Sequence, residues 1–60
     1  DRAELIMTIL QDRRQHSKNE VLGIMKDKGL GITEIMKTIA MMLKDGTICE
    51  PKDGYYQWIG

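Results

Sequence analysis

Apolar residues recur at helical spacing in three stretches of the chain. In the first, over residues 2–13, the apolar side chains that share one side of the turn are Leu5, Ile6, Ile9 and Leu10. Because residues three and four apart lie on one face of a helix, this spacing predicts an amphipathic helix. The polar run Arg13-Arg14-Gln15-His16 then breaks the pattern and predicts the end of the helix.

The second stretch opens with a capping signal. Ser17 is followed three residues later by Glu20, the spacing of a capping box, in which a hydroxyl and a carboxylate each satisfy an unpaired backbone amide. The residues predicted to face inward are Val21, Leu22 and Met25. Gly29 tolerates the left-handed conformation that ends many helices, so we predict the second helix to end there, with Leu30 folding back on Met25.

A third helix is predicted directly afterwards. Gly31 is the expected N-cap, and Glu34 lies in the first turn, where the helix dipole favours negative charge. The apolar stripe comprises Ile32, Ile35, Met36, Ile39, Met42 and Leu43. The opposite face carries Glu34, Lys37, Thr38, Met41 and Lys44. The pair Asp45-Gly46 is expected to end this helix.

The last stretch has the pattern of a β-hairpin. Strands are predicted over residues 47–50 and 55–59, around a turn in which Pro51 presets one backbone angle and Gly54 supplies a positive one. The inward-facing residues are predicted to be Ile48, Tyr56 and a largely buried Trp58, and the outward-facing ones Cys49, Tyr55 and Gln57. An isolated hairpin is not stable in water, so it is expected to pack on the helices. We also predict a strand of one or two residues near 15–17 that pairs with the hairpin.

The order of these elements predicts an α+β fold that is mostly α. The connection between the second and third helices is only about three residues long, which is typical of a helix-turn-helix, and the hairpin makes it a winged helix-turn-helix. Residues 1–60 are therefore expected to form one winged-helix domain with three helices and a C-terminal β-hairpin wing. Its predicted core comprises Leu5, Ile6, Ile9, Leu10, Val21, Leu22, Met25, Ile35, Ile39, Leu43, Ile48, Tyr56 and Trp58.

Composition narrows the possible functions. The 60 residues include nine Lys and Arg against nine Asp and Glu, so the formal net charge is zero. A dedicated nucleic-acid-binding domain usually carries a basic excess, and contact with DNA would therefore depend on a local patch. The only cysteine is Cys49, which excludes an intramolecular disulfide and favours a cytoplasmic setting. Because the chain begins at Asp1 rather than at methionine, we expect it to be a fragment of a longer protein.

The sequence lacks the motifs of the common catalytic and metal sites. It contains no phosphate-binding loop, no HExxH motif and no pair of Cys-x-x-Cys motifs. We therefore expect no catalytic, cofactor-binding or metal-binding residue and no enzymatic activity in this domain. His16 is interpreted as a solvated loop residue, and Cys49 as a half-buried strand thiol.

Basic residues form two candidate contact groups. The first, near the end of the first helix, consists of Arg13, Arg14 and Lys18. The second, along the third helix and the hairpin tip, consists of Lys37, Lys44 and Lys52, with Thr38 and Met41 on the same helix face. Each group could contact phosphates or simply keep the surface soluble. Because base edges are read mainly by Arg, Lys, Asn and Gln, the presence of Glu34 and Met41 fits a protein partner at least as well as a DNA groove.

The segment GTICEPKDGYYQWI resembles the C-terminal winged-helix domain of the archaeal minichromosome maintenance (MCM) replicative helicases. The matching residues are Gly46, Ile48, Glu50, Pro51, Lys52, Gly54, Tyr55 and Tyr56. The segment KGLGITEIMKTIAMMLKDG is also similar to the end of that family's second helix and to its third helix, so the resemblance covers residues 17–60. Asp53 and Trp58 depart from the family pattern, in which a further proline and a smaller or basic residue are usual.

This resemblance implies a regulatory and interaction module of a DNA replication helicase. The ATPase motor of that hydrolase, with its ATP and Mg²⁺, would lie upstream in a hexameric parent, whereas the isolated domain would be monomeric and hold no cofactor. The implied partners are other domains of the parent helicase, initiator proteins and weakly bound, non-specific DNA of the nucleoid, but no membrane. Through them the domain would modulate ATP hydrolysis and unwinding.

Two other functions remain open from the residues alone. A DNA-binding winged-helix module of a transcription regulator is the main alternative, and a basic stretch preceding Asp1 would favour it. A domain that binds left-handed DNA is a further possibility, because such a domain also carries a tryptophan in its wing. It would also need Asn and Tyr on the third helix, where this sequence has Lys37, Thr38 and Met41.

Overall fold

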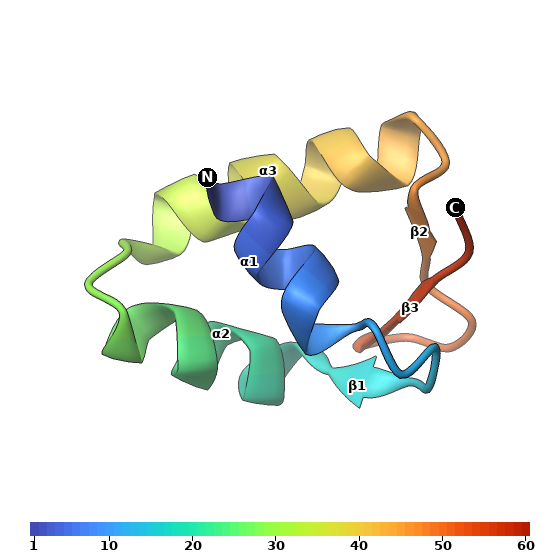
Figure 1. The fold of residues 1–60 in the computed structure, drawn as a ribbon, viewed down its shortest axis with the longest axis horizontal. Helices are drawn as coiled ribbons and strands as arrows, with labels where there is room; N and C mark the ends of the chain where they lie inside the picture. Colours follow the sequence, from blue (N-terminus) through green and yellow to red (C-terminus); the bar gives the residue numbers. More distant parts are fainter.

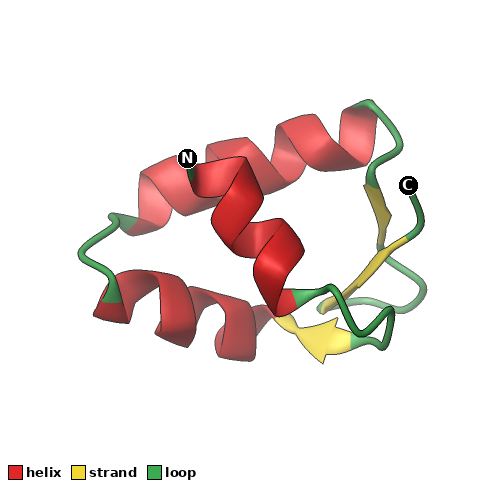
Figure 2. Ribbon diagram, in the orientation of Figure 1, coloured by secondary structure: helices red, strands yellow, loops and turns green.

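The computed structural model describes all 60 residues as a mostly helical α+β fold (Figures 1 and 2). Its elements are α1 (Arg2–Ile9), β1 (His16–Ser17), α2 (Lys18–Asp27), α3 (Ile32–Lys44), β2 (Ile48–Cys49) and β3 (Tyr55–Trp58). This is the predicted order, and it includes the short strand ahead of the second helix. None of the three helices combines the length and the apolar character needed to cross a membrane.

The three helices contact one another, and the strands lie together at one end of them (Figure 1). The sheet is antiparallel with the order β1-β3-β2, so the last strand along the chain is the central one. His16 pairs with Tyr56 on one side of β3, and Ile48 pairs with Trp58 on the other. The strands are shorter than predicted at three of the four hairpin boundaries, while Gly54 has the expected positive φ, 83°.

α1 ends earlier than predicted, at Ile9 with Leu10 as its C-cap, rather than near Arg13. Arg13 instead adopts a left-handed backbone conformation with a φ of 62°. One residue earlier, Asp12 turns the chain, because its Oδ1 accepts a hydrogen bond from the Arg14 amide at 2.9 Å. These two turns lead the chain from α1 into β1, so the polar residues after Leu10 form a loop.

The ends of α2 and α3 follow the predicted glycine signals. At the end of α2, the Leu30 amide donates to the Met25 carbonyl at 3.3 Å across Gly29, whose φ is 86°. This is the hydrogen bond of a Schellman motif, which only a residue at ease with positive φ can close without strain. Gly46 closes α3 in the same way with a φ of 79°, and Gly31 is the N-cap of α3, as predicted.

The buried core draws on every helix and on the last two strands. It comprises Ile6, Leu10, Val21, Met25, Ile35, Ile39, Met42, Ile48 and Tyr56. Five further residues of the predicted core are only partly buried around it, namely Leu5, Ile9, Leu22, Leu43 and Trp58. Ile32, predicted in the apolar stripe, is 51% exposed. It is the first residue of α3, and because side chains lean toward the N-terminus of a helix, it extends beyond the packed region.

Trp58 is the clearest departure from the predicted core. It packs against the core but remains partly exposed, whereas the sequence predicts it to be largely buried. The Arg13 guanidinium lies over its ring, 4.6 Å from the centroid. The strand alternation therefore gives the direction of Trp58 correctly but not its depth, because one side of the ring is covered by a charged side chain at the surface rather than by the core.

Candidate interaction surface

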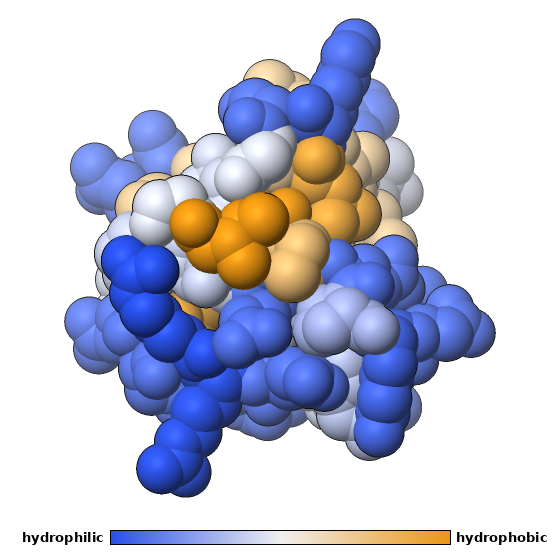
Figure 3. Space-filling model, turned by 90° about the vertical axis from the view of Figure 1, so that its right-hand side faces the viewer, coloured by the Kyte–Doolittle hydropathy of each residue, from blue (hydrophilic) through white to orange (hydrophobic).

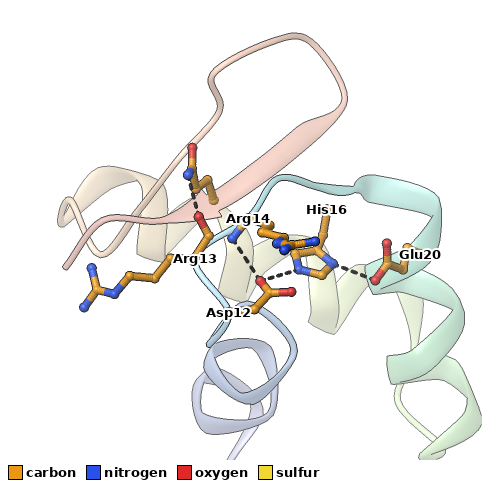
Figure 4. Close-up of polar contacts among 6 residues, drawn as sticks. Asp12, Arg13, Arg14, His16 and Glu20 are labelled. Carbon is orange, nitrogen blue, oxygen red and sulfur yellow. Dashed lines mark hydrogen bonds and ion pairs between the residues drawn. The ribbon is translucent and has the colours of Figure 1, made fainter.

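His16 is held between two carboxylates, which corrects its interpretation as a solvated loop residue. Its Nε2 lies 2.8 Å from Asp12 Oδ1 and its Nδ1 lies 2.6 Å from Glu20 Oε2 (Figure 4). The side chain is only 14% exposed. A neutral imidazole has a single N–H and cannot donate to both carboxylates, whereas the imidazolium donates to both. We call Asp12, His16 and Glu20 the His16 junction.

The His16 junction shifts the protonation of its members. The hydrogen bond with Asp12, followed by the one with Glu20, raises the pKa of His16 above its usual value of 6.5. The hydrogen bond with His16, followed by that from the Arg14 amide, lowers the pKa of Asp12 below 3.8. Both shifts favour the ion pair. Since Asp12 belongs to the loop after α1 and Glu20 to the first turn of α2, the junction ties α1, β1 and α2 together.

The junction also explains why only half of the predicted capping box forms. Ser17 is the N-cap of α2, and its Oγ accepts a hydrogen bond from the Glu20 amide at 3.1 Å. The Glu20 carboxylate binds the His16 ring. The sequence does contain a signal for this arrangement, because Asp12, His16 and Glu20 stand four residues apart. Residues four apart usually contact each other when they lie on one helix. Here the three residues belong to a loop, a strand and the first turn of a helix.

Arg13, from the first candidate contact group, makes three contacts within the chain. Its guanidinium stacks on Trp58 and donates to the Gly60 carbonyl at 3.2 Å. Its own carbonyl accepts a hydrogen bond from Gln57 Nε2 at 2.6 Å (Figure 4). The other two members of the group, Arg14 and Lys18, are exposed and form no ion pair or hydrogen bond through their side chains. In this group, therefore, Arg13 is bound within the chain, whereas the side chains of Arg14 and Lys18 remain free.

The outer side of α3 carries Lys37, Met41 and Lys44, which we call the α3 face. All three are exposed, and Met41 is 67% exposed. Their spacing of four and three residues places them along one side of the helix. Met41 and Lys44, together with Asp45, line a shallow, open depression. Neither lysine has an ion-pair partner.

Three other residues predicted beside the α3 face have internal contacts. Glu34 pairs with Arg2 of α1 at 2.8 Å, so its charge is offset. Thr38 is partly buried, and its hydroxyl donates to the Glu34 carbonyl at 2.9 Å. Lys52 stacks on the Tyr55 ring with its Nζ 4.3 Å from the centroid, in the β2–β3 turn at the far end of β2 from α3 (Figure 1). The second candidate group therefore reduces to the α3 face and a separate lysine.

An apolar area lies near the hairpin. Figure 3 shows it on the side that carries the C-terminal end of α3 and the sheet, surrounded by hydrophilic side chains. Ile59, just after β3, is 54% exposed. Cys49 in β2 is a free, partly buried thiol, as predicted.

No known family profile, curated protein sequence or solved structure matches the chain.

Proposed function

We propose that this chain is a winged-helix module that binds proteins and regulates a DNA replication helicase of the kind that the minichromosome maintenance resemblance implies. In this proposal β2, β3 and their turn are the wing, and α3 occupies the position of a recognition helix. The observation that carries the proposal is the composition of the α3 face. An exposed Met41 stands between Lys37 and Lys44 on a domain of zero net charge.

A protein partner explains this face better than a DNA groove does. A recognition helix in the major groove reads base edges with hydrogen-bonding side chains. At the centre of the α3 face, Met41 offers a flexible and polarizable thioether, which suits adaptable contacts with apolar side chains. Lys37 and Lys44 can neutralise only a few phosphates, which supports weak and non-specific DNA binding as a secondary property.

In this proposal catalysis resides elsewhere in the parent protein. The ATPase motor, with its ATP and Mg²⁺, lies outside these residues, and the domain adjusts the rate of that motor. Deleting the domain from such a hexameric helicase should therefore change ATP hydrolysis and unwinding without abolishing them. Loss of all ATP hydrolysis from a ring that still assembles would contradict the proposal.

Titration of the 60-residue chain with duplex DNA tests the proposal directly. We expect affinities too weak for sequence reading, and a slope of log affinity against log salt of about −2 to −3, because about two or three phosphates are neutralised. Lys37→Glu with Lys44→Glu should weaken this binding, whereas Lys26→Glu with Lys28→Glu is the matched control on α2. Nanomolar, sequence-specific binding at physiological salt would instead identify a transcription regulator.

That alternative has one observation in its favour. Arg14 and Lys18 are exposed and without side-chain partners, and Lys52 stands at the tip of the hairpin. A domain that places its first helices and its wing tip against phosphates could use these three positions. The gene sequence upstream of Asp1 separates the two functions, because only the helicase proposal requires an ATPase motor there.

A further inference from the structure

The α3 face combines an exposed apolar side chain with two cations that have no ion-pair partner. Met41 is the most exposed of the large apolar residues, ahead of Ile59, Ile32 and Ile24. Two acidic residues lie on this side of α3: Glu34, which is offset by Arg2, and Asp45, which follows Lys44 at the end of the helix. Neither Lys37 nor Lys44 forms an ion pair within the chain, so both ammonium groups can reach a partner, with an apolar contact point between them.

We propose that the α3 face binds an acidic helical segment of another polypeptide, with an apolar side chain set between two carboxylates. This inference rests on the proposed function and names the chemistry of the partner. Lys37 and Lys44 are seven residues apart, which corresponds to about 10 Å along the helix axis. Carboxylates seven residues apart on a partner helix span the same distance, and the residues three and four positions after the first carboxylate then face Met41.

The depression at the end of the α3 face adds a place for the apolar side chain. Met41 and Lys44 line it together with Asp45. A Leu or Ile side chain entering it would contact the Met41 thioether, while the carboxylates of the partner reach the two ammonium groups. Removing apolar surface from water supplies binding energy, and the ion pairs fix the register of the two helices.

A polypeptide fits the α3 face better than a nucleic acid does. A phosphate backbone that follows α3 presents a negative charge at every nucleotide and would pass close to the Asp45 carboxylate. A helix with only two carboxylates places one at Lys37 and one at Lys44, so only one of its charges comes near Asp45. A polypeptide also supplies the apolar side chain that Met41 requires, which a phosphate backbone does not.

The test uses designed peptides and a charge exchange. The probe is a helical peptide with Glu at two positions seven apart and Leu at the third and fourth positions after the first Glu. A matched peptide has Lys in place of both Glu residues. Binding to the 60-residue chain is followed by amide chemical shifts at 0.15 M salt, where exposed charges more than about 8 Å apart are largely screened. We expect the Glu peptide to bind at least tenfold more tightly than the Lys peptide and to shift the α3 signals.

The variants distinguish a specific face from general attraction. Lys37→Glu with Lys44→Glu should reverse the preference, so that the Lys peptide binds more tightly. Lys26→Glu with Lys28→Glu changes the net charge equally, also near a helix C-terminus, and should leave the preference for the Glu peptide in place. Met41→Ser should weaken binding severalfold while the melting temperature is unchanged. The reversal is a gain of binding, so unfolding cannot produce it.

Several results would overturn the proposal. No binding of the Glu peptide at millimolar concentration, or equal loss of binding in both double variants, would refute the acidic-helix partner. Tighter binding of a duplex DNA to the same α3 signals would replace it with nucleic acid. If deletion of the domain alters the helicase motor although the peptide does not bind, only this inference fails. If the peptide binds but deletion leaves the motor unchanged, the regulatory function fails instead.

Discussion

The His16 junction and the α3 face are both polar surface regions rich in charge, yet they differ in where their charges are directed. At the junction, two carboxylates lie within 2.8 Å and 2.6 Å of one imidazole. On the α3 face, Lys37 and Lys44 have no ion-pair partner. The comparison teaches that charge and exposure do not suffice to identify a contact surface. What distinguishes a candidate is the absence of internal partners.

The largest effect is expected from the two adjacent methionines of α3, of which one is exposed and the other buried. Met42 is 4% exposed in the core, and Met42→Ala should destabilise the domain by about 2–5 kcal/mol. Met41 is 67% exposed, and Met41→Ala should change stability by no more than about 0.5 kcal/mol. Urea denaturation of both variants measures the difference. Equal losses would mean that the α3 face is part of the core and not available to a partner.

The next largest loss of stability is expected when the His16 junction is broken. His16→Ala removes two charge-assisted hydrogen bonds to half-exposed carboxylates, so we expect a loss of about 1–2 kcal/mol at mildly acidic pH. Thermal melts of the wild type and the variant at pH 5.5 and pH 8 give the measurement. Glu20→Gln serves as a milder control, because it keeps the shape and removes one charge.

The pH dependence of this loss follows from the direction of each pKa shift. The pKa of His16 is raised in the folded state, so His16 stabilises the fold fully below pH 6.5, its usual pKa. This stabilisation is lost as the pH rises through the higher pKa of the folded state. The pKa of Asp12 is lowered, so its contribution is present above 3.8 and is lost as the pH falls through the lower folded value. The junction therefore stabilises the fold most between these two limits. If the melting temperatures of the wild type and of the His16→Ala variant change in parallel from pH 5.5 to pH 8, the His16 junction does not make this pH-dependent contribution.

A smaller effect concerns the start of α2. Ser17→Ala removes the hydroxyl that accepts from the Glu20 amide, and we expect a loss of about 1 kcal/mol. Ser17→Gly should lose only a few tenths of a kcal/mol, because glycine is tolerated at an N-cap. Chemical denaturation of the two variants provides the comparison. An alanine variant as stable as the wild type would show that the His16–Glu20 contact alone fixes the helix start.

The smallest effect concerns the guanidinium over Trp58. Arg13→Lys keeps the charge but loses the planar group, and we expect it to cost at most about 1 kcal/mol. Trp58 is the only tryptophan, so its fluorescence reports the contact directly. A changed emission maximum with near-native stability is the expected outcome. An unchanged spectrum would indicate that Arg13 does not cover the ring in solution.

Local signals in the sequence predicted much of the fold. Ser17, Gly29 and Gly46 mark helix ends through interactions with residues a few positions away, and all three do so in the structure. Contacts between distant segments were not predictable in this way. The Arg2–Glu34 ion pair and the Arg13–Trp58 contact depend on how the elements are placed in space, which periodicity does not specify.

The candidate surface was predictable only in part. The exposed positions of Lys37, Met41 and Lys44 follow from the helical period, and the structure agrees. His16 was misjudged because a spacing of four residues predicts contact only along one helix, whereas here the contacts with Asp12 and Glu20 form across a loop, a strand and a helix start. The relationship to the minichromosome maintenance helicases and the function it implies remain predictions.

The central position of β3 has a consequence for how the chain folds. β1 lies near the start of the chain, but it pairs only with the last strand, so the sheet cannot form until residues 55–58 are present. Closing so long a loop is slow compared with forming a helix. Until then the helices lack Ile48 and Tyr56, two of their core partners. A chain truncated after Gly46 should therefore retain some helical circular dichroism but lose cooperative unfolding, whereas a sharp melting transition would show that the helices assemble without the sheet.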